Sequence, residues 1–575
     1  MRECGALQWR KIPNPEIPNP KEVPILPAAV LAATNAGVSK NLKNIGLVSG
    51  ATLLSRVLGL VRDMQTAAVF GLSGVSSAFF TAFQLPNLFR RLLGEGSLTA
   101  AFVPTLGIEL EQRRRAGAFE LVNQVASWLL VVTGALTAAA MIFFSQPAWL
   151  EAAARVFVGD ENSIRLWLLS GNMTVVLFPY LVFVCLAAVF SSALQTLGRF
   201  LEPAISPVWL NIAMISLLWL GTRVWGGAGQ EAKMAQAHAL CAGVLLGGLG
   251  QMAVPGWALW REGWRPRFAL ELSEPVRAIF RLMAPTVLGS AVYLVNMTVA
   301  RYIGLSLNEG AVALLNFSQR LMELPIGVFA IAVSTVVFPL ISRHAAQNDE
   351  AGMAGAYRKG MRLVLLANIP AAAGLGVLAL PVIRLLFQRG EFAASDTAAM
   401  APVLAIYAAG LPFFAFVNLV LRAFHARRDT VTPMWGALIS FAVNIILCLA
   451  LMRALSTAGL AIAGGVSIVA QAVFLQARLT RKSPGMAFRH IGRDLAKIIA
   501  ASVVMGGAAR AGWAAWSHFL PHTKWLDAAG LALVIAAGIV IYGALAWLLR
   551  VEGREEFRAV LARKPRPAPE SESSP

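Results

Sequence analysis

The feature of this sequence that most constrains its fold is a long series of apolar segments. From Asn44 onward we count fourteen of them, each about 20 residues or longer and bounded by glycine, proline or clusters of charge. Segments of this length and polarity can cross a bilayer as helices, so an all-α polytopic membrane protein with fourteen transmembrane helices is expected. The predicted spans are residues 44–70, 76–106, 119–145, 164–195, 202–222, 236–260, 276–304, 310–342, 356–387, 397–424, 431–453, 457–479, 492–515 and 526–549.

The composition agrees with this prediction and argues against other classes. Hydrophobic residues make up 57% of the chain and charged residues 14%, and the mean hydropathy is +0.65. A formal net charge of +19 is compatible with nucleic-acid binding, but the basic residues form short clusters between apolar spans, as membrane topology requires. No nucleic-acid partner is therefore expected. The sequence shows no HExxH pair, Walker loop, GxSxG elbow or metal-type cysteine spacing, which argues against a hydrolase, an ATP-driven pump and a metal cofactor.

The basic clusters predict an orientation. If the N-terminus is cytoplasmic, every even-numbered connection between spans is basic, while the odd-numbered connections hold only isolated basic residues. An even number of spans then leaves both termini in the cytoplasm. The cytoplasmic basic residues are Arg113, Arg114, Arg115, Arg199, Arg261, Arg265, Arg267, Arg343, Arg358, Lys359, Arg427, Arg428, the run 478–482 and the tail after residue 549.

An internal repeat divides the spans into two halves. Residues 193–203 match residues 423–433 in pattern, and the prolines at 147, 179 and 203 have spacings similar to those at 381, 412 and 433. Six spans per half, both halves starting inside, predict two six-helix lobes related by pseudo-two-fold symmetry about an axis along the membrane normal. The substrate path is then expected between the lobes, and the last two spans lie outside the repeat.

This division gives the expected domain boundaries. Residues 1–40 form a proline-rich N-terminal tail that we expect to be disordered, with translation starting near Val38. The N-lobe is residues 41–262, the C-lobe residues 263–482, and two additional helices occupy residues 483–550. Residues 551–575 are expected to be a disordered cytoplasmic tail.

Ionisable residues inside the first two spans point to a function. Arg56, Arg62, Arg90 and Arg91 lie at depths where a charge facing lipid costs roughly 2.5 kcal/mol or more. Arg56 lies about 18 Å along the first helix, too deep for its side chain to reach either surface easily. The arrangement of lowest cost is a hydrated cavity between helices, lined by guanidinium groups. Such a cavity attracts anions, above all phosphate.

The eighth span carries a second charged pair, Arg320 and Glu323, followed by Pro325 and Gly327. The proline and glycine predict a broken helix of the kind that transporters place at their binding sites. A structural ion pair is an alternative interpretation for Arg320 with Glu323 and for Arg62 with its neighbour in sequence. For Arg91, the alternative is an anchor at the membrane surface.

These residues lie in four segments whose sequences resemble the MurJ (MviN) family, the lipid II flippases of the MOP superfamily, to which MATE exporters and O-antigen flippases are also related. The segments are SRVLGLVRD (55–63), AFFTAFQLPNLFRRLLGEGSLTAAFVP (78–104), QRLMELPIGVF (319–329) and RAFHARRDTVTP (422–433). The resemblance extends over residues 41–550, including the fourteen spans.

The resemblance implies a function and a site. The family's cationic cavity would consist of Arg56, Arg62, Arg90 and Arg320, with Arg91 and Glu323 beside it. Family members often have an acid where this chain has Ser77 and a base where it has Gln84, so a carboxylate role there is not transferred. The two additional helices would form a lateral groove for the polyprenyl tail.

By this resemblance, the chain moves lipid II from the inner to the outer leaflet of the bacterial cytoplasmic (inner) membrane by alternating access, for cell wall synthesis. It is then a transporter and not an enzyme, with lipid II, membrane lipids and proteins of cell-wall synthesis as partners. No cofactor is expected. Transport would be coupled to the membrane potential or to a monovalent cation, for which Asn444 is a candidate.

Three other functions stay open at this point. A flippase for another polyprenyl-pyrophosphate-linked glycan would keep the same cavity and change the sugar contacts. A MATE-like drug or cation antiporter would need buried acids, whereas the deep charges here are mostly arginines. A membrane-embedded transferase would need paired carboxylates or a metal cluster at one face, and the sequence offers neither.

Overall fold

The computed structural model describes residues 28–93, 97–157, 160–227, 229–427, 429–488, 491–521 and 523–552, and within these residues it contains helices and no strands. The N-terminal half comprises α1 (Ala28–Phe70), α2 (Gly74–Leu93), α3 (Ser97–Phe144), α4 (Pro147–Phe157), α5 (Glu161–Leu177), α6 (Tyr180–Thr196), α7 (Leu201–Val224) and α8 (Gln230–Arg261). The remainder comprises α9 (Glu274–Leu305), α10 (Ala311–Ala346), α11 (Glu350–Val377), α12 (Ala379–Phe387), α13 (Ala394–Ala426), α14 (Val431–Lys482), the 3-10 turn η1 (Pro484–Met486), α15 (Gly492–Phe519) and α16 (Lys524–Leu548).

The helices follow the predicted spans, with some spans divided and others joined. The predicted span 76–106 is divided between α2 and the start of α3. Two pairs of spans are joined by kinks, at Arg114 in α3 (φ 55°) and at Ser456 in α14 (φ 48°). Both kinks lie where the sequence predicted a connection between spans.

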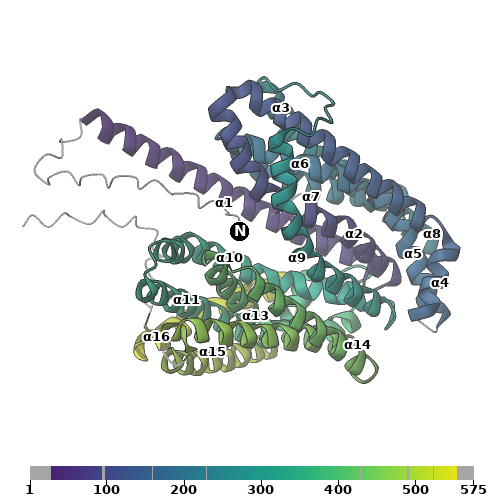
Figure 1. Cartoon of the computed structure of the whole chain (residues 1–575). Coiled ribbons are helices and arrows are strands. Elements are labelled where there is room, and N and C mark those ends of the chain that lie inside the picture. Colours follow the sequence, from purple (N-terminus) through teal and green to yellow (C-terminus); the bar gives the residue numbers. More distant parts are fainter. Residues whose placement is uncertain are drawn as a thin grey trace, which may run out of the picture.

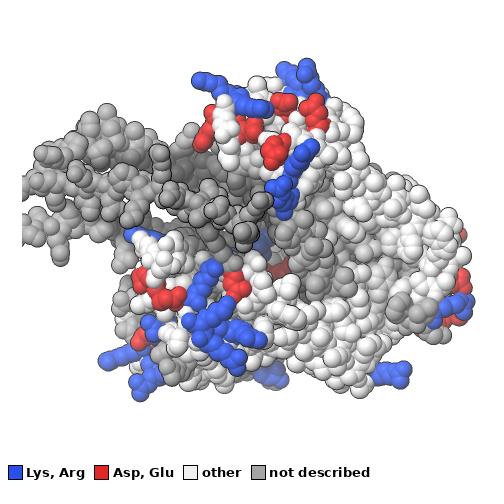
Figure 2. Space-filling model, viewed as in Figure 1, with Lys and Arg blue, Asp and Glu red and all other residues white. Residues whose placement is uncertain are grey.

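Eight helices of the described residues are long and apolar enough to cross a membrane, or nine if the bent pair α5 and α6 is one span. The bend between those two helices is 44° and falls at Pro179, the N-cap of α6. In Figure 2, charged side chains gather at the ends of the molecule, and the described surface between them is nearly free of charge. The chain is therefore a multi-pass, all-helical membrane protein, and the number fourteen stays a prediction.

The helices form two bodies that repeat one packing scheme (Figure 1). In the first, α6 packs on α3 and α8, and α1 packs on α7. In the second, α13 packs on α11 and α14, and α9 packs on α14. This correspondence is the one that the repeated sequence pattern predicts. Helices α15 and α16 pack on each other and against α11 and α12, outside the repeated scheme.

One place where the two lobes contact each other is the end of α1, which we call the closed end. There the backbone N–H of Glu391 donates a hydrogen bond to the carbonyl of Ala68 (2.9 Å). Glycines allow this approach: a Cβ on Gly71 would lie 2.6 Å from the Glu391 carbonyl oxygen, and one on Gly310 would lie 2.7 Å from that of Leu72. The lobes therefore meet main chain to main chain at this end, beside an ion pair between Lys233 of α8 and Glu391 (2.8 Å).

Helices α10 and α1 differ from the sequence prediction. The break predicted at Pro325 and Gly327 is wrong, because α10 runs through both residues to Ala346. A proline inside a helix removes only one N–H donor, and neighbouring helices in a membrane protein can compensate for that loss. At the N-terminus, α1 begins at Ala28, directly after Pro27 and within the predicted tail. The rest of that tail and the C-terminal tail from residue 553 lie outside the described residues.

Candidate functional site

The centre of the site is a carboxylate shared by two arginines from different lobes. Asp63 on α1 is almost fully buried, with 1% of its surface exposed. Arg62, next to it, donates from Nε (2.9 Å) and from a terminal nitrogen (2.7 Å) to Asp63 Oδ1. Arg320 on α10 places Nε 3.0 Å from Asp63 Oδ2, as an ion pair without hydrogen-bond geometry. The predicted Arg62 ion pair therefore exists, and it also joins the lobes.

Two further residues, Asn211 and Gly59, determine where these arginines lie. Asn211 on α7 accepts a hydrogen bond from Arg62 (3.1 Å) and donates one to the Ser55 carbonyl (3.1 Å). Gly59 lies where Arg320 approaches α1, and a Cβ there would collide with the Arg320 guanidinium. Helix α1 is continuous through Gly59. The small residue therefore leaves room for the opposite lobe's arginine.

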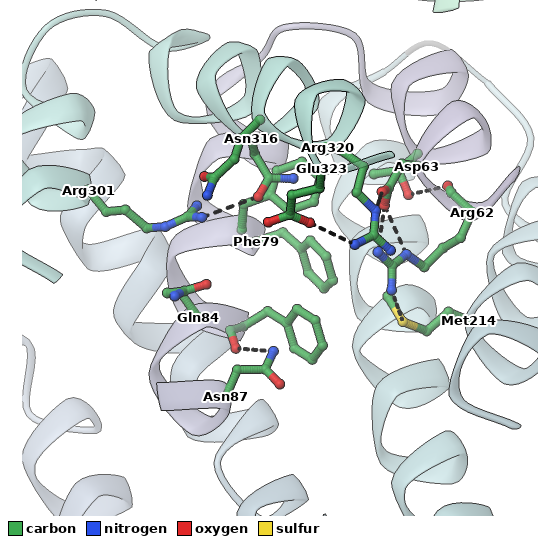
Figure 3. Close-up of a pocket in the computed structure, with 14 residues that line it drawn as sticks. Arg62, Asp63, Phe79, Gln84, Asn87, Met214, Arg301, Asn316, Arg320 and Glu323 are labelled. Carbon is green, nitrogen blue, oxygen red and sulfur yellow. Dashed lines mark hydrogen bonds and ion pairs between the residues drawn. The ribbon is translucent and has the colours of Figure 1, made fainter. Parts of the chain in front are cut away.

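Around this cluster lies a cavity of about 160 Å³, which we call the central cavity. Its wall includes Arg62, Asp63, Arg320 and Glu323, together with Arg301 of α9. Figure 3 shows Arg301 on the side opposite Arg62, Asp63 and Arg320. Glu323 lies 3.4 Å from Arg320, so the predicted i,i+3 pair forms, and 43% of the Glu323 side chain is exposed. The pair is therefore part of the cavity wall.

A second cavity of about 420 Å³ extends into the N-lobe, and we call it the N-lobe side cavity. It shares Arg62 and Arg320 with the central cavity and adds Arg90, whose Nε donates to Asn87 Oδ1 (3.2 Å). Three of the predicted arginines therefore meet at one surface. The other polar residues on its wall are Gln84, Asn87, Thr99, Tyr180, Ser191, Ser192, Gln195, Ser206 and Gln251.

A third cavity of about 220 Å³ lies between α9, α10, α13 and α14, and we call it the C-lobe side cavity. It shares Arg301, Asn316 and Gln319 with the central cavity. The side chain of Arg301 donates to Asn316 Oδ1 (3.3 Å). Sequence reasoning missed this arginine because it lies near the end of the predicted span 276–304, where a long side chain is expected to reach the membrane surface.

The other residues that the sequence singled out have different positions. Arg56 lines none of the three, and its guanidinium lies 3.4 Å from the backbone oxygen of Glu323, across the lobe boundary. The side chain of Arg91 lies outside the described residues. Asn444 lines the C-lobe side cavity. Ser77, which stands where relatives often have an acid, accepts a hydrogen bond from the backbone N–H of Ala313 (3.2 Å) and so joins α2 to the start of α10.

The charge of the site follows from these walls. Across the central and N-lobe side cavities, the described lining residues include Arg62, Arg90, Arg301 and Arg320 against Asp63 and Glu323, a net charge of +2. Guanidinium groups bind phosphate oxygens in pairs, and in a shielded cavity such contacts are stronger than in water. The arrangement can therefore hold an anion with about two negative charges. Among the described residues that line these cavities, no nucleophile is paired with a base.

Comparisons with known proteins agree with this geometry. The family model described as "Lipid II flippase MurJ" matches residues 66–526. A probable lipid II flippase MurJ from Rhizobium meliloti is 35% identical over 518 residues, which is 88% of this chain and 93% of the relative. A lipid II flippase MurJ from Burkholderia cenocepacia is 29% identical over 470 residues, which is 80% of this chain and 88% of the relative.

Solved structures show the same fold. One described as "Lipid II flippase MurJ, inward closed conformation" superposes with a TM-score of 0.68 at 24% identity, covering 90% of this chain and 100% of the other. An inward-facing MATE family multidrug transporter of the MOP superfamily gives a TM-score of 0.57 at 15% identity, with 75% and 95% covered. Because the family model and the 35% identical relative each span most of the sequence, the chain belongs to the lipid II flippase MurJ family.

Proposed function

We propose that this protein translocates lipid II, an undecaprenyl pyrophosphate that carries a muramyl disaccharide and a pentapeptide, across the bacterial inner membrane. The observation that carries the proposal is the net +2 charge on walls contributed by both lobes. The pyrophosphate diester carries about two negative charges, so it matches the walls in charge and in guanidinium geometry.

In this proposal, the pyrophosphate binds where Arg62, Arg90 and Arg320 meet, at the boundary of the central and N-lobe side cavities. Arg320 and Arg62 are held there by Asp63 when no substrate is bound. A diphosphate that reaches Arg320 competes with Asp63 for the same guanidinium. Substrate binding therefore weakens a contact between the lobes and favours their movement relative to each other.

The proposed transport cycle is alternating access with both termini in the cytoplasm. The closed end is then the outer side, and the substrate enters from the inner side. The cavities, of about 160 to 420 Å³, suit fragments smaller than a disaccharide with a pentapeptide, so the lobes must separate further to admit the substrate. The undecaprenyl tail stays in lipid, in a groove beside α15 and α16.

The membrane potential is the proposed energy source. It contributes about 2.3 kcal/mol per elementary charge per 100 mV, and its negative interior favours outward movement of an anion. No cofactor is needed for this step. Coupling to a monovalent cation, with Asn444 beside its path, is the alternative. Membrane lipids and proteins of cell-wall synthesis complete the proposed set of partners.

Complementation tests the proposal. In cells depleted of their own flippase, Arg56→Ala, Arg90→Ala and Arg320→Ala should each fail to restore growth while the protein reaches the membrane at normal levels. Arg223→Ala is the matched control, because Arg223 stacks on Trp219 and lines none of the three cavities, so it should complement. Native mass spectrometry should show that the wild-type protein retains lipid II in preference to other anionic lipids. Growth with Arg90→Ala and Arg320→Ala, the two variants of cavity-lining residues, would contradict the assignment.

A further inference from the structure

The C-lobe side cavity is not explained by pyrophosphate binding. It lies inside one lobe, with walls from α9, α10, α13 and both arms of the kinked helix α14. Its volume of about 220 Å³ is more than ten times the roughly 15 Å³ that one water molecule requires. The cavity therefore has room for a chemical group of several atoms. It joins the central cavity at Arg301, Asn316 and Gln319.

The polarity of this cavity indicates what kind of group it takes. Of the described side chains on its wall, Arg301 is the charged one, and no aspartate or glutamate is among them. The other polar groups there are neutral donors and acceptors: Asn316, Gln319, Tyr407, Ser440, Asn444, Ser467 and Gln471. A fixed guanidinium without a lining acid favours an anion and repels a cation. Carboxylates are the anions that guanidinium groups commonly bind in two-point contacts.

The position of Arg301 relative to the other arginines adds a constraint. Figure 3 shows it across the central cavity from Arg62 and Arg320. A ligand that contacts Arg301 and the Arg62 and Arg320 pair at the same time must carry two anionic groups separated by a bulky neutral part. In lipid II, the pyrophosphate and the peptide are attached to the same muramyl sugar, and the peptide ends in a carboxylate that is ionised at neutral pH.

We propose that the C-lobe side cavity is a carboxylate subsite, in which Arg301 binds an anionic end of the substrate's peptide while the sugar occupies the central cavity. The proposal rests on the proposed function and assigns a separate part of the substrate to a separate lobe. Asn316 positions the guanidinium through its hydrogen bond from Arg301. The neutral side chains of α14 receive the remaining polar atoms of the peptide.

The test compares three probes on the purified full-length protein in lipid nanodiscs: lipid II, lipid II with its peptide carboxylates amidated, and undecaprenyl pyrophosphate. The wild-type protein should bind lipid II about tenfold more tightly than the amidated form, a difference equal to about 1.4 kcal/mol. Arg301→Gln should bind lipid II and the amidated form equally, because the guanidinium that distinguishes the peptide carboxylate is gone. Arg223→Gln is the matched control and should behave as the wild type with all three probes.

A second variant keeps the test independent of how Arg301→Gln folds. Gln471→Glu adds a negative charge to the same wall without changing the size of the side chain. It should weaken binding of lipid II and leave that of undecaprenyl pyrophosphate unchanged. Two outcomes would overturn the subsite and leave the proposed function standing. In one, Arg301→Gln loses affinity equally for all three probes; in the other, the wild type binds lipid II no more tightly than its amidated form. Failure of the wild type to prefer lipid II over other anionic lipids would overturn the proposed function itself.

Discussion

The two lobes present arginines to the same central cavity in different ways. In the N-lobe, Arg62 contacts the buried carboxylate of Asp63, which also pairs with Arg320 from the other lobe. In the C-lobe, Arg301 donates to a neutral amide, and no acid lines its side cavity among the residues that the structure describes. The two lobes therefore differ. The N-lobe contributes an arginine that is paired with the buried acid Asp63, whereas the C-lobe contributes Arg301, whose side cavity has no acid among its described lining residues.

This difference indicates that the N-lobe cluster depends on its acid for stability. Asp63→Asn removes the shared charge and leaves two guanidinium groups close together. Breaking a buried ion pair in this way costs about 3 kcal/mol or more. We expect a large loss of thermal stability in detergent and loss of complementation, whereas Arg301→Gln should keep near-normal stability. Equal melting temperatures for Asp63→Asn and the wild type would show that the N-lobe arginine cluster does not depend on its acid for stability.

A smaller effect is expected where the lobes interlock. Gly59→Ala places a methyl group against the Arg320 guanidinium. Because that guanidinium is the end of a flexible side chain, it can move away and its contact with Asp63 is weakened, but Arg62 still pairs with Asp63, so stability should fall less than in Asp63→Asn. We expect weakened substrate binding and slower growth in the complementation assay. Gly50→Ala, with no neighbouring atom within 4 Å of the new methyl, is the matched control, and the same defect in both variants would contradict the role of Gly59.

The smallest effect concerns an exposed ion pair of the C-lobe, in contrast to the buried one. Asp429, in the connection before α14, lies 2.5 Å from Lys482. Burial raises the pKa of Asp429, but hydrogen bonds from Lys482 and Thr432 outweigh it and lower the pKa to about 2. A lowered pKa means that the stabilisation is complete above the ordinary value near 3.8 and is lost as the pH falls through about 2.

Asp429→Asn should therefore reduce the free energy of unfolding at pH 7 by less than about 1 kcal/mol, as is usual for exposed pairs. The difference from the wild type should disappear as the pH approaches 2. Thermal unfolding of both proteins across this pH range measures it. A difference that stays constant down to pH 2 would mean that the Asp429 carboxylate is not its source.

Much of the fold could be predicted because membrane helices are defined by local sequence. Hydropathy located the helices, and the kinks at Arg114 and Ser456 lie between predicted spans. The cost of burying charge likewise pointed to Arg62, Arg90 and Arg320, which share one cavity. The proline in α10 misled the prediction, because whether a helix breaks there depends on its neighbours and not on the proline alone.

Contacts between the lobes were harder to predict because they depend on three-dimensional packing. The sequence identified Asp63 as a partner of Arg62, but only the packed lobes bring Arg320 to its other oxygen. The division of the site into three cavities likewise depends on how α9, α10 and α14 meet. Arg301 lies near the end of a predicted span and so carried a weaker sequence signal, and its place between two cavities is a property of the assembled C-lobe.

The glycine-lined contact at the closed end has a consequence for regulation. Main-chain amides and carbonyls do not titrate near neutral pH and keep the same hydrogen-bonding groups whatever side chain is present, so neither acidity nor salt is expected to release this contact directly. A side chain at Gly71, Gly310 or Gly390 would collide with the main chain of the opposite lobe, so substitution of these glycines is expected to push the two lobes apart at this end. The ion pair between Lys233 and Glu391 at the same end (2.8 Å) is the part of this contact that salt is expected to weaken, while the main-chain hydrogen bond persists.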